Sequence, residues 1–248
     1  MTMRRLIRSE FRKLTTTKMP FAFLGVLVGI AAINAAIVIA GTDMDGSKTF
    51  ISTADDQQSL VAFAANGFVL AALFGAIAVA REYGHHTVVP TFLASPRRHR
   101  AVGAQLFTVA VGGAVLSLVG AALTIGAVTL TLPTTDYSLL ISGGTIARLL
   151  AAAAFAGASG ALLGAGIGAV VRTIGGAVTG TTIALIIAPP LVVQLSRDAE
   201  PWMPNGLANQ LSGVAGNLST AAAIAGLLAW ALVPAGIGLL TVERRDIV

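Results

Sequence analysis

Six stretches of this chain contain no charged residue and are long enough to cross a lipid bilayer. They cover residues 19–42, 57–80, 101–135, 149–171, 173–196 and 201–242. A membrane-spanning helix needs about 20 apolar residues, so six of them use about half of the 248 residues. Too little chain is left for a separate soluble catalytic domain of the usual ~100–150 residues. We therefore expect an all-α integral membrane protein, with one transmembrane domain over residues 1–248.

The uncharged stretches also give approximate positions for the spans. We place six transmembrane helices at about 20–40, 60–80, 102–130, 146–171, 174–195 and 220–241. The third stretch has 35 uncharged residues and would extend about 50 Å as a helix, so we expect it to tilt or to project beyond the ~30 Å hydrocarbon core. Pro189 and Pro190 are expected to break or kink the fifth helix, because each lacks a backbone donor. The polar segment 196–219 is expected to be external or re-entrant.

The positive charges are unequally divided between the two sides of this topology. Of the 16 Lys and Arg, 13 lie in the N-terminal segment, the second and fourth connections and the C-terminus, and three (Lys48, Arg148 and Arg197) lie opposite. Cytoplasmic connections carry the excess of Lys and Arg, so both termini are expected to be cytoplasmic. No nucleic-acid partner is expected, since these residues are not gathered on one solvated face.

The first 18 residues have the pattern of an amphipathic helix. Met3, Ile7, Phe11 and Leu14 fall on one helical face. Much of the rest is basic, through Arg4, Arg5, Arg8, Arg12 and Lys13. Such a helix lies at the membrane interface, with its cations near anionic lipid. The alternatives are a basic anchor that only fixes topology and a cleaved secretory signal, although the apolar stretch after residue 18 exceeds the ~7–15 residues of a signal core.

The connection between the second and third spans, residues 81–100, is the cytoplasmic connection long enough to form a structure of its own. It reads REYGHHTVVPTFLASPRRHR, with apolar residues between an Arg-Glu pair and a basic run. This pattern favours a short helix on the membrane surface that presents an apolar and charged edge to another protein. The alternative is a solvated basic loop that only fixes the topology.

In this connection Arg81 and Glu82 are followed by Thr87, Leu93, Ser95 and Pro96, and then by Arg97, Arg98 and Arg100. The order resembles that of the permease subunits of ABC-2 type exporters. The basic N-terminal helix, the six spans, the broken segment before the last span and the tail Glu243-Arg244-Arg245-Asp246 extend the resemblance. The chain departs from the family pattern at Pro90 and at Gln105, where many relatives have a basic residue.

The resemblance implies half of an exporter in the bacterial cell membrane. Two permease protomers form the pathway for an amphiphilic or apolar cargo such as a drug, a peptide antibiotic or a lipid, and separate ATP-binding cassette subunits bind ATP and Mg²⁺. Connection 81–100 is then the element that contacts the ATPase, with candidate residues Arg81, Glu82, Tyr83, Gly84, His85, His86, Thr87, Phe92 and Leu93. Candidate membrane-surface residues are Arg4, Arg5, Arg8, Arg12, Lys13, Arg97, Arg98 and Arg100.

Enzyme activity and a bound cofactor are not expected in this chain, because it has no G-x-x-x-x-G-K-[ST] phosphate loop. No zinc site is expected either, because the adjacent His85 and His86 would diverge on a helix. An intramembrane enzyme would need paired carboxylates or a Ser with its base, which the proposed spans lack. An ion-driven secondary transporter is the alternative function, although such carriers usually keep an acidic or His residue inside the membrane.

Two glycine patterns indicate close helix packing. Gly160, Gly164 and Gly168 are spaced four residues apart, as are Gly176 and Gly180. Glycine at this spacing lets two helices approach closely in a membrane. We favour packing within one protomer, and contact between two protomers is the alternative.

Overall fold

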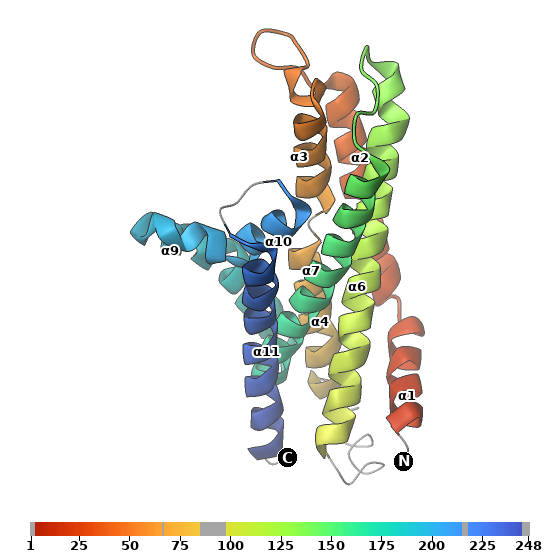
Figure 1. Cartoon of the computed structure of the whole chain (residues 1–248). Helices are drawn as coiled ribbons and strands as arrows, with labels where there is room; N and C mark the ends of the chain where they lie inside the picture. The colour runs from red at the N-terminus through yellow and green to blue at the C-terminus, as the bar shows by residue number, and fades with distance from the viewer. Residues whose placement is uncertain (1–2, 66, 85–97, 215–217, 245–248) are drawn as a thin grey trace.

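The computed structural model describes residues 3–65, 67–84, 98–214 and 218–244, and these residues form a bundle of helices (Figure 1). The expected all-α class is confirmed. Five helical stretches are long and apolar enough to cross a membrane, which is the pattern of a multi-pass membrane protein. They are Met19–Ala40, His99–Thr134, Gly143–Val171, Ile174–Leu195 and Thr220–Val242.

The elements follow one another in an up-and-down order. The first half of the chain contains α1 (Met3–Thr15), α2 (Met19–Ala40), a 3₁₀ turn (Thr49–Ile51), α3 (Ala54–Ala65), α4 (Phe68–Gly84), α6 (Arg98–Thr131) and a second 3₁₀ turn (Leu132–Thr134). The second half contains α7 (Gly143–Val171), α8 (Ile174–Thr182), a π turn (Ile183–Ile187), α9 (Ala188–Leu195), a 3₁₀ segment (Arg197–Trp202), α10 (Pro204–Ser212) and α11 (Thr220–Arg244).

The region expected to be the second span is divided into two shorter helices. α3 has 12 residues and ends at Ala65, α4 has 17 residues and begins at Phe68, and Gly67 lies in the break between them. Gly67 faces α6 so closely that a Cβ there would lie 2.7 Å from the Ser117 hydroxyl. The break is therefore covered by protein, which is the setting in which irregular backbone is tolerated at membrane depth.

Helix α7 is the centre of the bundle and packs against α4, α6 and α11. Three of its glycines face the α4 backbone. A Cβ at Gly160, Gly164 or Gly168 would overlap the carbonyl oxygen of Phe68, Ala72 or Ala76, respectively. Gly180 of α8 likewise faces Ile167 of α7. Packing within one protomer is thus confirmed for Gly160, Gly164, Gly168 and Gly180, whereas Gly176 lies against Val171 and Thr173 at the turn between α7 and α8.

Helix α8 bends before it continues as α9. The π turn Ile183–Ile187 comes directly before the expected kink at Pro189 and Pro190, and both features disturb regular α-helical hydrogen bonding. Figure 1 shows α9 leaving the bundle almost crosswise, near the N-terminal end of α11. None of the residues of α9 is buried. The kink predicted from the two prolines is confirmed.

The chain returns from α9 to the bundle through the segment that was expected to be external or re-entrant. The 3₁₀ segment and α10 form there, and α10 packs against α11 and α7. Leu207 and Ala208 of α10 are buried, in the same cluster as Leu163 of α7 and Leu227 of α11. This segment therefore belongs to the packed structure.

Candidate functional site

The two ends of the bundle differ in the segments that they hold. Figure 1 shows both termini, the end of α4 and the start of α6 at one end, and the connections 41–53 and 132–142 at the other. The candidate residues that the structure describes lie on α1, at the end of α4 and at the start of α6, and so belong to the first of these ends. Their described members bring together α1, α4, α6 and the turn between α7 and α8.

An ion-pair cluster joins α1 to the last turn of α4. The Lys13 ammonium donates to Glu10, with 2.6 Å between Nζ and Oε1, and to Glu82, with 3.2 Å between Nζ and Oε2. Glu10 is 4% exposed and Glu82 is 8% exposed. Lys13 and Glu82 are 69 residues apart in the sequence, so this cluster fixes the N-terminal helix to the point where the 81–100 connection begins.

The cluster holds two carboxylates around one ammonium, and this shifts the pKa of Glu10 and that of Lys13. Burial, together with the neighbouring Glu82 carboxylate, raises the pKa of Glu10 to about 7, although Lys13 opposes the shift. Burial tends to lower the pKa of Lys13, but Glu82 and Glu10 outweigh it and the pKa is raised. Glu10 therefore gains and loses a proton near neutral pH, while Lys13 stays charged.

A second contact joins the same turn of α4 to the α7–α8 turn. The Arg172 guanidinium carbon lies 5.2 Å from the centre of the Tyr83 ring, within the range of a cation–π interaction. Arg172 caps the C-terminus of α7 with a left-handed backbone, φ 62°. Its Nε and Nη2 atoms are buried and make no hydrogen bond among the described residues. We call Glu10, Lys13, Glu82, Tyr83 and Arg172 together the α4 junction.

The α4 junction is a packed contact between helices. The crevice beside its ion pairs, also lined by Arg81 and Gln105, has a volume of only about 10 Å³. That is about the volume that one water needs. The junction is therefore suited to passing a displacement of α4 to α1 and α7 and offers no room for a substrate.

The candidate coupling residues fall into two groups. Arg81, Glu82, Tyr83 and Gly84 form the last turn of α4, so the connection begins as helix. His85, His86, Thr87, Phe92, Leu93 and Arg97 lie outside the described residues. Among the basic candidates, Arg98 begins α6 and Arg100 is exposed in its first turn.

The candidates on α1 are separated by the packing of that helix. Arg4, Arg5, Arg8 and Arg12 are exposed, whereas Lys13 lies in the α4 junction. The residues that α1 buries are Leu6 and Glu10, which leaves Met3 of the predicted apolar face exposed. Figure 1 shows α1 running alongside the end of α6, an orientation that differs from the flat interfacial helix expected.

Sequence reasoning did not single out Glu10 as a site residue. It is the only acidic residue among the first 18, and it stands three positions before Lys13, a spacing that brings two side chains together on a helix. An isolated acid in a strongly basic segment was the available signal. Arg172 gave no comparable signal, because its contact with Tyr83 depends on how α7 packs against α4.

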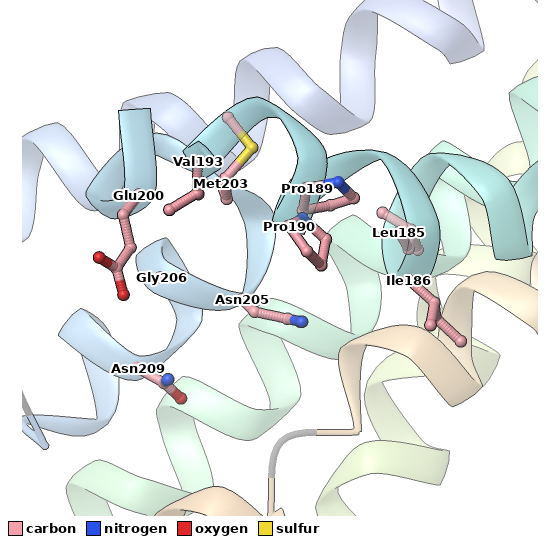
Figure 2. Close-up of a pocket in the computed structure, with 10 residues that line it drawn as sticks. All are labelled: Leu185, Ile186, Pro189, Pro190, Val193, Glu200, Met203, Asn205, Gly206 and Asn209. Carbon is pink, nitrogen blue, oxygen red and sulfur yellow. The ribbon is translucent and has the colours of Figure 1, made fainter. Parts of the chain in front are cut away.

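A second candidate site is a cavity of about 400 Å³ between the π turn, α9 and α10 (Figure 2). We call this region the elbow and the cavity the elbow cavity. Its apolar lining comes from Leu185, Ile186, Pro189, Pro190, Val193 and Met203. Glu200, Asn205 and Asn209 supply polar groups. Figure 2 shows Glu200 and Asn209 toward one end of the cavity and Leu185 and Ile186 toward the other. The cavity thus has an apolar end and a polar end.

The described residues contain no group of three or more His, Asp or Glu placed to hold a metal ion. No protein-family model matches the chain, and a search of curated proteins finds no match.

Proposed function

We propose that this chain is the membrane-spanning permease subunit of an ABC-2 type exporter in a bacterial cell membrane. Two protomers form the pathway, a separate ATP-binding cassette subunit hydrolyses ATP, and both termini are cytoplasmic. The cargo is amphiphilic or apolar. The observation that supports this proposal is the α4 junction, because it lies where the connection proposed to contact the ATP-binding subunit begins.

The junction can pass motion in two directions. A partner that moves the 81–100 connection would pull on the last turn of α4, which is tied to α1 through Lys13 and to the α7–α8 turn through Arg172. Along its length α4 is held against α7 by backbone contacts at Gly160, Gly164 and Gly168, which leave no space for independent sliding. A displacement at the α4 terminus would therefore move α1, α4 and α7 together.

The distribution of charge supports an energy source outside the membrane. The five long helical stretches able to cross the membrane contain no Asp, Glu or His beyond the first two residues of α6, and in the shorter α3 and α4 the acids lie in the first turn (Asp55, Asp56) and the last turn (Glu82). Proton-driven carriers usually keep such a group inside the membrane. The buried carboxylate of Glu82 lies in the last turn of α4, and that of Glu10 is joined to the same turn through Lys13. This placement favours a partner-driven mechanism over ion coupling.

Five of the six proposed spans are long single helical stretches, and the remaining one, the second in the chain, consists of α3 and α4 together. Figure 1 shows them arranged end to end, α3 nearer the 41–53 connection and α4 nearer the termini. Their helices contain 12 and 17 residues, which at 1.5 Å per residue is enough for a ~30 Å hydrocarbon core. The other spans are α2, α6, α7, α8 with α9, and α11.

Affinity purification of the tagged chain from its native membrane tests the proposal. We expect an ATP-binding subunit in stoichiometric amount. Replacing His85, His86 and Thr87 with alanine should remove that subunit, whereas replacing Met44, Asp45 and Gly46 at the opposite end should retain it. Both variants are compared as monodisperse protein by size-exclusion chromatography, so that loss of the partner is separated from loss of folding.

Two results would overturn the proposal. One is a chain that purifies without any ATP-binding subunit and moves a lipophilic dye in ATP-free proteoliposomes under an ion gradient, which would favour the secondary transporter. The other is retention of the ATPase by both variants, which would exclude the 81–100 connection as the docking element.

A further inference from the structure

The elbow cavity has the composition of a small-molecule site. Six apolar side chains and three polar ones line about 400 Å³, within the 300–1,000 Å³ range of pockets that bind drug-sized ligands. The cavity is positioned by Pro189 and Pro190, which turn α9 away from the bundle, and by α10, which packs back against α11. It is thus a product of the kink itself.

The polar end of the cavity is anionic. Glu200 is exposed, and it forms no ion pair with any residue that the structure describes. Its backbone is fixed from both sides, because its carbonyl accepts from the Met203 N–H at 3.2 Å and a Cβ at Gly206 would lie 2.5 Å from the same oxygen. The backbone from which the Glu200 side chain extends is therefore held in place at the cavity edge.

The segment that holds Glu200 is itself net negative. The 3₁₀ segment Arg197–Trp202 carries two acidic residues, Asp198 and Glu200, and one basic residue, Arg197. A field of this sign attracts cations and repels anions. Next to an apolar wall, a charge of opposite sign is also held more strongly than in open water.

From this arrangement we propose that the elbow cavity binds a lipophilic monovalent cation. The apolar body of the ligand lies against Leu185, Ile186 and Pro190, and its charged centre lies beside the Glu200 carboxylate, with Asn205 adding a polar contact. The binding site is independent of the energy source. Only its role as a cargo site depends on the proposed function.

Equilibrium binding of radiolabelled tetraphenylphosphonium to the full chain tests this site. The protein is placed in nanodiscs of phosphatidylcholine, without nucleotide, and binding to empty nanodiscs is subtracted. Glu200→Gln should weaken binding about fivefold, the value of an ion pair at a partly exposed position. Asp198→Asn is the matched control, because it removes an acid from the same 3₁₀ segment but not from the cavity lining, and it should bind as the wild type does.

Two further measurements separate charge from shape. Val193→Trp fills the cavity from α9 and should abolish saturable binding. Tetraphenylborate, which has the same shape and the opposite charge, should show no saturable binding to the wild type. Equal affinity of wild type and Glu200→Gln, or tetraphenylborate binding as tight as that of the cation, would overturn the proposal. Because the assay contains neither ATP nor a partner, its failure is distinguishable from failure of the ATPase co-purification.

Discussion

Helices α7 and α9 are both apolar, yet α7 is largely buried in the bundle and α9 has no buried residue. The stretches that contain them, Gly143–Val171 and Ile174–Leu195, have nearly the same mean hydropathy. Of the 18 most apolar consecutive residues in each stretch, 61% are buried in the first and 22% in the second. Eleven of the fourteen buried residues of α7 are Gly or Ala, whereas α9 presents Pro, Leu and Val outward and buries none. Size separates the two helices where hydropathy does not.

This difference follows from the bilayer as a solvent. Lipid tails are as apolar as leucine, so moving a large apolar side chain inward gains little. Small residues gain more, because they let backbones approach and increase dispersion contacts. The contact of Gly164 with Ala72 is the clearest case, since no side chain separates the two helices there. In this protein the inside is therefore marked by small residues, and the few large ones inside fill specific gaps.

Matched leucine substitutions test this comparison and carry the largest expected effect. Leu163→Ala in α7 removes a side chain that is 1% exposed, and it should destabilise the protein by about 3 kcal/mol through the cavity that it leaves. Leu191→Ala in α9 removes one that is 54% exposed and should have almost no effect. Melting temperatures from size-exclusion chromatography of heated samples measure both.

The comparison breaks if the two substitutions have equal effects. A large loss for Leu191→Ala would mean that α9 is packed in the assembled protein, most directly against a second copy of the chain. Chemical cross-linking of wild type and Leu191→Ala would then show less dimer for the variant.

Charge patterning made most of the fold predictable from the sequence. α2, α6, α7 and α11 begin and end within about four residues of the expected ranges, because each fills an uncharged stretch bounded by charged or polar residues. The elbow was predictable from Pro189 and Pro190. The division of α3 from α4 was not, because it arises where Gly67 meets Ser117 of a distant helix.

The candidate site was predictable only in part. The Arg81-Glu82 pair at the start of connection 81–100 predicted a functional role for the end of α4. The pairing of Glu82 with Lys13 could not be foreseen, because Lys13 was expected among the exposed cations of the membrane surface. Burial of Glu10 depends in the same way on how α1 packs against α6.

The α4 junction is the place where charge, and not residue size, determines what is buried. Removing its cation tests this exception. Lys13→Met leaves Glu10 and Glu82 facing each other without an ammonium. We expect a loss of about 2 kcal/mol, below the 3–5 kcal/mol of a fully buried pair because 31% of the Lys13 side chain is exposed. The melting temperature should fall accordingly.

Two companion variants separate charge from helix propensity. Arg12→Met makes the same kind of change at an exposed neighbour and should leave the melting temperature within about 1–2 °C of the wild type. Lys13→Met combined with Glu10→Gln removes the repulsion and should recover part of the loss. An equal fall for Arg12→Met, or no recovery in the double variant, would show that the ion pairs do not stabilise the junction.

The smallest expected effect is the dependence of stability on pH. Because the pKa of Glu10 is raised from 4.5 to about 7 on folding, the folded protein binds more protons than the unfolded chain between these values. The contribution of Glu10 is therefore fully present below pH 4.5, decreases as the pH rises and is lost above about pH 7. Glu10→Gln cannot titrate, so the melting temperature of the wild type should fall relative to that of the variant as the pH rises from 4.5 to 7. Comparing the two proteins cancels every titration that they have in common. A difference that stays constant from pH 4.5 to 7 would mean that Glu10 is ionised throughout and that Lys13 alone determines its charge.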